Sequence, residues 1–216
     1  MKSIFIVLVN ALTLISSSTK NIDSYYFYYE SIPNSIKEEM INNSYKENDY
    51  ITFDDLSLVH ILYKGFDDKI HKGELIVNKK IASDIVEIFK VLYENNYKIE
   101  SVERIDKYNG DDNLSMKNNN TSAFNYRNIE GTNTLSNHSY GLALDLNPLY
   151  NPYVYESNGN LIVSPIEGVK YIDRTLEFPY KIDKNDLAYK EFTKRGFTWG
   201  GDWLNKKDYQ HFEKIN

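Results

Sequence analysis

The spacing of apolar residues predicts one long helix in the first half of the chain. Between Lys79 and Tyr93, apolar side chains recur every three or four positions, at Ile81, Ile85, Ile88, Phe89 and Leu92. This spacing gives a helix one apolar face that packs on a core. A shorter series at Ile32, Ile36 and Met40 favours another helix. We therefore expect a helical N-terminal part over about residues 32–95.

A different period governs the second half. Leucines stand at every second position from 142 to 146, with Ala143 and Asp145 between them, which predicts a strand with its leucines toward the core. We expect a helix over residues 186–194, a final strand over residues 209–215, and a loop in the polar stretch 109–120. Helices thus precede strands without regular alternation. The expected fold class is α+β, a small antiparallel sheet with flanking helices.

The N-terminus has the layout of a secretory signal peptide. Lys2 precedes a mostly apolar run over residues 4–15, and serines follow at 16–18. The run is shorter than the roughly 20 residues of a membrane span. We expect residues 1–18 to be a signal peptide and residues 19–216 to be a single domain. The mature form is expected without a membrane span, secreted or in the cell envelope outside the cytoplasmic membrane.

Composition narrows the chemistry further. The 216 residues include no cysteine, which excludes disulfides, thiolate metal sites and cysteine nucleophiles. A formal net charge of −6 argues against nucleic acid as a partner. A histidine-based metal site must draw on His60, His71, His138 and His211. His60 lies in an apolar run and is expected to be structural, whereas His71 lies in a polar turn and is expected to be solvated.

Three of the remaining side chains form a candidate metal site. His138 stands at the start of the predicted strand, Asp145 lies on its face opposite the leucines, and His211 comes from the C-terminal segment. Two histidines and one carboxylate are ligands that suit Zn²⁺, and they leave a fourth position for water. For His138 and Asp145 alone, the alternative is a hydrogen-bonded pair in a polar pocket.

Two carboxylates flank His211. Asp208 lies three residues before it, close enough to act on a metal-bound water as general base and later as general acid. Glu213 lies two residues after it, on the same face of the predicted strand, where it can orient the imidazole. The alternatives are a turn residue for Asp208 and a surface charge for Glu213.

Two motifs together resemble the zinc signature of the D-alanyl-D-alanine carboxypeptidase (VanY-type) peptidases, a family that includes L-alanyl-D-glutamate endopeptidases. They are Ser136-x-His138-x-x-Gly141-x-Ala143-x-Asp145 and Asp208-x-x-His211-x-Glu213. Residues 121–127, Asn147-Pro148, Asn151-Pro152-Tyr153 and the run from Trp199 to Trp203 resemble the endopeptidase-like branch. The resemblance extends over about residues 99–214, and more weakly from residue 32.

This resemblance implies a hedgehog/DD-peptidase-like zinc peptidase fold with one Zn²⁺ per chain. It implies His138, Asp145 and His211 as metal ligands and Asp208 as the catalytic carboxylate. Arg127 resembles an arginine that faces the scissile carbonyl or a substrate carboxylate, where a guanidinium can stabilise an oxyanion. The alternative for Arg127 is a structural salt bridge.

The family also implies how a substrate is held. Ser136 is expected to bind polar groups of the substrate, and Trp199 and Trp203 are expected to wall the cleft. Core packing is an equal alternative for both tryptophans.

The function implied is that of a hydrolase, a zinc metallopeptidase that acts on peptidoglycan stem peptides in the cell wall. We expect cleavage between L-Ala and D-Glu, with D-alanyl-D-alanine carboxypeptidase activity as the alternative. A non-catalytic zinc-containing wall-binding or signalling domain is the alternative of another class, because the hedgehog signalling domain resembles this fold and retains a similar zinc site. A monomer is expected.

Overall fold

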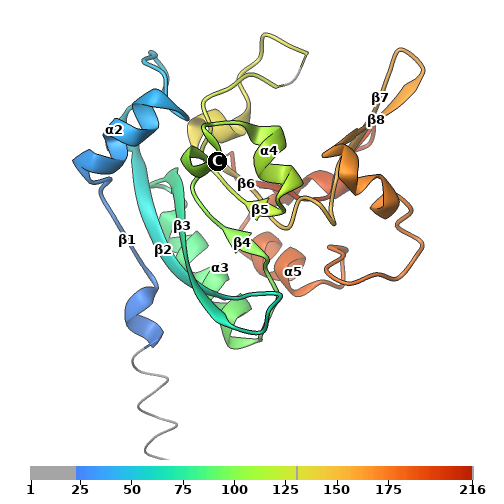
Figure 1. Ribbon diagram of the computed structural model, residues 1–216, viewed down its shortest axis with the longest axis horizontal. Helices are drawn as coiled ribbons and strands as arrows, with labels where there is room; N and C mark the ends of the chain where they lie inside the picture. The colour runs from blue at the N-terminus through green and yellow to red at the C-terminus, as the bar shows by residue number, and fades with distance from the viewer. Residues whose placement is uncertain (1–22, 130, 216) are drawn as a thin grey trace, which may run out of the picture.

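The computed structural model describes residues 23–129 and 131–215, in which helices pack on small antiparallel sheets (Figure 1). This mixture agrees with the expected α+β class. The predicted signal peptide, residues 1–18, lies outside the described residues. Within them, no helix combines the length and the apolar character that crossing a membrane requires.

A long β-hairpin occupies the centre of the N-terminal half. Strands β2 (Leu56–Lys64) and β3 (Ile70–Asn78) pair antiparallel over nine residues each, and β1 (Tyr28–Glu30) pairs with β2 on its other side. Alternate residues of the hairpin enter two separate cores. Val59 and Leu75 pack in the core that contains α3 (Ala82–Glu94), whereas Leu58 packs in the core that contains Met40 of α2 (Asn34–Asn42).

The expectation of a helical part over residues 32–95 is therefore wrong in its middle. Both faces of the hairpin are covered, so residues 56–63 form a nearly continuous apolar run that shows no alternation. The helices at either end are present. In α3, Ile85, Ile88, Phe89 and Leu92 are at most 1% exposed, which confirms the predicted apolar face. Figure 1 shows α3 lying against the hairpin.

Short strands build the second half. β11 (His211–Glu213) lies between β6 (Ala143–Asp145) and β9 (Thr198–Trp199), and both pairings are antiparallel. A second sheet has the order β10 (Lys206–Asp208), β7 (Tyr153–Ser157), β8 (Asn160–Ser164). β4 (Ser101–Val102) and β5 (Asn120–Thr121) form a parallel pair.

The predicted strand around residue 144 and the predicted helix after residue 186 are both present. Leu144 and Leu146 are fully buried in the main core. Helix α5 (Leu187–Lys194) begins after Asp186, whose side chain accepts a hydrogen bond from the Ala188 amide. The ring of Phe192 in α5 stacks on Phe212 at 4.2 Å between centroids. This contact fixes β11 against α5.

The stretch 109–120 is not the predicted loop throughout, because it contains helix α4 (Asp112–Lys117). The Asp111 side chain caps the helix by accepting from the Leu114 amide, and Ser115 and Met116 are buried. Six residues are too few for a helical period to appear in the sequence. The remaining short elements are the 3₁₀ turns η1 (Ser24–Tyr26), η2 (Phe53–Asp55), η3 (Ile105–Tyr108), η4 (Asn137–Tyr140), η5 (Ile166–Tyr171) and η6 (Gly200–Asp202).

Candidate metal centre

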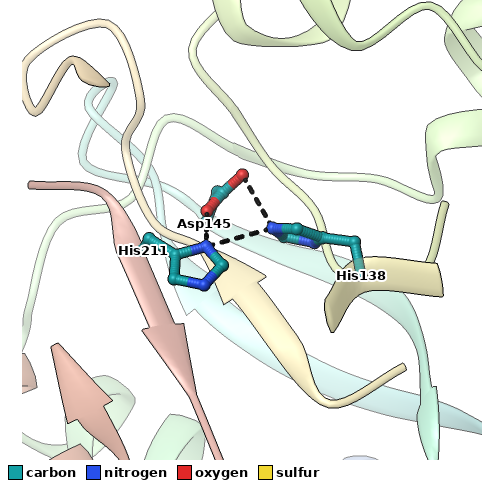
Figure 2. Close-up of side chains that lie close together, drawn as sticks. All are labelled: His138, Asp145 and His211. Atoms are coloured by element: carbon teal, nitrogen blue, oxygen red, sulfur yellow. Dashed lines mark hydrogen bonds and ion pairs between the residues drawn. The ribbon is translucent and has the colours of Figure 1, made fainter. Parts of the chain in front are cut away.

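Three buried side chains converge between η4 and the sheet of β6 and β11 (Figure 2). Asp145 and His211 are direct partners in the antiparallel register, and His138 lies in η4, which leads into β6. Gly141 makes that turn, since its φ is +66° and a Cβ there would lie 2.6 Å from the Asn78 amide nitrogen. The three site residues are 3–5% exposed.

The three side chains form a compact triangle in which each histidine faces a different oxygen of the Asp145 carboxylate. His138 Nε2 lies 3.2 Å from His211 Nδ1 and 3.2 Å from Asp145 Oδ2, and His211 Nδ1 lies 3.0 Å from Asp145 Oδ1. In a tetrahedral zinc site with bonds of 2.0–2.1 Å, neighbouring ligand atoms lie about 3.3 Å apart. The contacts between these side chains are thus close to the separations of zinc ligands, and one ligand atom from each residue lies within 4.8 Å of the others.

In each histidine ring, the nitrogen that points away from the triangle donates a hydrogen bond, and this contact fixes the tautomer of the neutral ring. His138 Nδ1 donates to the Ala123 carbonyl oxygen at 2.6 Å, and His211 Nε2 donates to Glu213 Oε2 at 3.0 Å. Both acceptors lack a proton, so each neutral ring directs its lone pair inward. Asn137 Nδ2 also donates to Glu213 Oε2, at 2.7 Å, and holds that carboxylate in place.

The triangle is therefore a site for positive charge. Two lone pairs and a carboxylate in a buried space repel one another unless a cation or a proton lies among them. Burial opposes charge on His211, but hydrogen bonds to Asp145 and Glu213 raise the pKa of its ring to about 10. Burial also disfavours the Asp145 carboxylate, yet the two histidines hold its pKa well below the usual range. The donor set fits Zn²⁺, whose binding would displace the proton.

A cavity of about 320 Å³ opens on the triangle. Eight of the nine side chains predicted for the site line it, and these are His138, Asp145, His211, Asp208, Arg127, Ser136, Trp203 and Glu213. The prediction fails for Trp199.

Trp199 packs in the main core and is 5% exposed. Its indole nitrogen donates to the Tyr209 carbonyl oxygen at 2.9 Å, so the ring fastens the turn between Asp208 and His211. A Cβ at Gly201 would lie 2.3 Å from this ring, and one at Gly200 would lie 2.6 Å from the Asp208 carbonyl oxygen. The two glycines thus allow close packing around β10, and Trp199 is not a wall of the cleft.

Asp208 ends β10 and lines the cavity. Its Oδ1 is buried and has no hydrogen-bond partner among the described residues. Burial raises the pKa of Asp208 to about 7, although the positive charge of His211 acts in the opposite direction. Gln210, which is 1% exposed, hydrogen-bonds to the Asp208 carboxylate. A carboxyl group in the same cavity as a metal-bound water can accept a proton and later return it.

Arg127 forms a salt bridge, which was its alternative role, and also lines the cavity. Its Nη2 forms a 2.6 Å ion pair with Asp112 of α4, and both side chains line the cavity. Burial raises the pKa of Asp112, while Arg127 opposes that change. The Arg127 Nε is buried without a hydrogen-bond partner in the described part of the chain. The salt bridge therefore holds a guanidinium at the cavity.

The two other predicted substrate contacts lie beside the metal ligands. Ser136 Oγ accepts a hydrogen bond from the His138 amide at 3.3 Å and caps η4. The Trp203 ring centroid lies 5.3 Å from that of His211. His60 and His71, as expected, lie elsewhere, with contacts to Glu30 and Asp67.

Sequence reasoning missed several polar lining residues, among them Asp112, Tyr153, Lys206 and Gln210. Lys206 stands two residues before Asp208, so alternation along a strand through 206–208 would have placed both on one face. Asp112 gave no such signal because α4 was not predicted.

Two histidines and an aspartate around one cation position, with a further carboxylate in the same cavity, are typical of mononuclear zinc hydrolases. Residues 130–214 match the family model described as D-alanyl-D-alanine carboxypeptidase. The match confirms, for this part of the chain, the resemblance to that family of zinc peptidases. It includes the metal triangle and Asp208 but begins after Arg127.

Comparison with curated proteins and with solved structures gives no match. The likeness to the hedgehog-like fold therefore stays a prediction.

Proposed function

We propose that the chain is a zinc peptidase that hydrolyses an amide bond in peptidoglycan stem peptides outside the cytoplasmic membrane. The observation that carries this proposal is the triangle of His138, Asp145 and His211, which shares a cavity with the unpaired Oδ1 of Asp208. The family match over residues 130–214 supports the peptidase chemistry. The predicted signal peptide supports a location where the chain meets peptidoglycan.

Each side chain has a defined task in this mechanism. His138, Asp145 and His211 hold the zinc ion, and Glu213 and the Ala123 carbonyl fix the orientation of the two rings. Bound zinc supplies a Lewis acid that acidifies a water molecule and polarises the scissile carbonyl. Asp208 accepts the proton from the attacking water and returns it to the leaving amine. Arg127 stabilises the negative charge that develops on the carbonyl oxygen.

The bond that we propose is the one between L-Ala and D-Glu. An aspartate at position 208, residues 151–153 and the run from Trp199 to Trp203 resemble the endopeptidase-like branch. The description of the matching family favours the second candidate, removal of the terminal D-Ala. A zinc-containing wall-binding domain without hydrolysis is the remaining candidate.

Digestion of a muropeptide with a pentapeptide stem distinguishes these candidates. The zinc-loaded protein is incubated with the muropeptide, and the products are identified by mass spectrometry. Release of the stem after L-Ala supports the proposed bond, whereas loss of a single alanine supports the carboxypeptidase. An intact muropeptide, with zinc shown to be bound, contradicts both peptidase assignments. His211→Ala serves as the matched inactive control.

A further inference from the structure

Lys206 differs from the other charged side chains that line the cavity. Arg127 and Asp112 neutralise each other at 2.6 Å, and Asp145 and Glu213 contact the histidines. Arg127 and Lys206 are the two cations of the lining. Across the described ranges 23–129 and 131–215, no carboxylate lies within ion-pair distance of the Lys206 ammonium. The cavity thus presents one cation that its own acidic groups do not engage.

Two aromatic rings hold this cation. Lys206 Nζ lies 4.7 Å from the ring centroid of Trp203 and 5.7 Å from that of Tyr153. Both rings also line the cavity. Cation–π contacts attract the ammonium group but use none of its three N–H donors in strong hydrogen bonds. The side chain is therefore placed while its donors stay available to an anion.

The strand aligns Lys206 with Asp208. Residues two apart in a strand point to the same face, at a spacing of about 7 Å. Lys207 lies between them, does not line the cavity, and donates to the Gly201 carbonyl oxygen at 3.0 Å. An anion bound by Lys206 would thus lie within one substrate residue of the amide on which Asp208 acts.

We infer that Lys206 binds a carboxylate on the substrate residue that contributes the nitrogen of the scissile amide. This inference rests on the proposed function and specifies its substrate. Both candidate bonds meet the requirement, because the terminal D-Ala has a free α-carboxylate, and D-Glu keeps its own when the chain continues through its γ-carboxyl group. In each case the carboxylate carbon is two bonds from the scissile nitrogen. The protein consequently selects stems with a free acid at this position over stems with an amide.

Four synthetic stem pentapeptides test this selection, with the D-Glu α-carboxyl and the terminal carboxyl each left free or amidated. Dissociation constants are measured by calorimetry on zinc-loaded Asp208→Asn protein, in which turnover is blocked. Amidation of one of the two carboxyls should weaken binding roughly 10–100-fold, the range of a charge-assisted hydrogen bond. When Lys206→Gln is added to this protein, binding of the peptide with the free carboxyl should weaken to the same extent, and binding of the amidated peptide should not change. Lys206→Arg should restore the preference.

Lys207→Gln is the matched control, since it removes the same charge from the neighbouring position and should leave all four constants unchanged. Equal binding of the four peptides, or an equal loss with all four in Lys206→Gln, overturns the inference. The proposed function fails separately: a Lys206-dependent preference without cleavage by the wild-type protein supports the carboxylate site and contradicts the peptidase. Cleavage by the wild-type protein without that preference supports the peptidase and contradicts the carboxylate site.

Discussion

At the residue scale, the outer contacts of the two histidines decide what the site can bind. The Ala123 carbonyl and Glu213 each accept a hydrogen bond from one ring, so in the neutral rings the nitrogens that face Asp145 carry the lone pairs. The ligands were predicted from the resemblance of two motifs to a zinc signature, and Glu213 from its place two residues after His211 on one face of a strand. Ala123 could not be predicted, because a backbone carbonyl leaves no trace in residue type.

Removing one ligand should abolish zinc binding. His138→Ala or His211→Ala leaves two ligands, which are too few for a stable site. We expect each variant to retain less than roughly one-tenth of an equivalent of zinc after dialysis. Metal analysis of the purified proteins measures this. His60→Ala removes a histidine outside the cavity and should keep one equivalent; full zinc in His211→Ala would contradict the assignment.

Asp208→Ala should separate metal binding from turnover. The variant keeps all three ligands and should retain zinc, but it lacks the group that moves the proton. We expect the turnover rate to fall by about 10²–10⁴-fold. Rates on muropeptides, measured beside the zinc content, test this; a wild-type rate would refute the proton-transfer role.

At the scale of elements, prediction succeeded where one face of an element is buried and failed where two are. Helix α3 has a single apolar face, and its residues were correctly predicted. The β2–β3 hairpin lies between two cores, so its apolar run carried no period. Helix α4 is stabilised by the local cap from Asp111 and by the burial of Met116, and its six residues are too few to show a helical period in the sequence.

The first turn of α5 should make stability depend on pH. Burial raises the pKa of Asp186 to about 6 from 3.8, while the Ala188 amide opposes this change. A raised pKa means that the folded state binds the proton more tightly than the unfolded state. The stability that protonated Asp186 gives the folded state is therefore fully present below pH 3.8 and is lost as the pH rises through 6. Asp186→Asn keeps the cap acceptor without the charge. It should stabilise the protein at pH 7.5, on the order of 1–3 kcal/mol.

Denaturant unfolding of both proteins in chelator, at several pH values from 4 to 7.5, measures this difference. The advantage of Asp186→Asn should shrink steadily toward pH 4. A difference that stays constant across the range would show that ionisation of Asp186 is not its cause.

At the scale of the whole molecule, the site joins segments that are distant in the sequence. His138 and Asp145 come from one turn and strand, and His211 comes from β11, which pairs with β6 and β9. A ligand that binds only the folded arrangement stabilises it by mass action, by about 4 kcal/mol when present at 1,000 times its dissociation constant.

Removal of zinc with a chelator should therefore lower the melting temperature by several degrees, and added zinc should restore it. Differential scanning calorimetry measures the change. His211→Ala should melt at the same temperature with and without zinc. An identical shift in that variant would place the stabilising metal elsewhere.

The separation of His211 from Asp145 also determines when, during biosynthesis, the protein can acquire its metal. A growing polypeptide that has reached Asp145 carries two of the three ligands, but the strand that orders them emerges 66 residues later. Ribosome-bound chains consequently have no complete chelate, and neither has a precursor kept unfolded for translocation. Loading then waits until β11 inserts between its neighbours. Under the proposed export, the ion is drawn from the compartment in which folding finishes, and the zinc concentration outside the cytoplasmic membrane governs how much active protein forms.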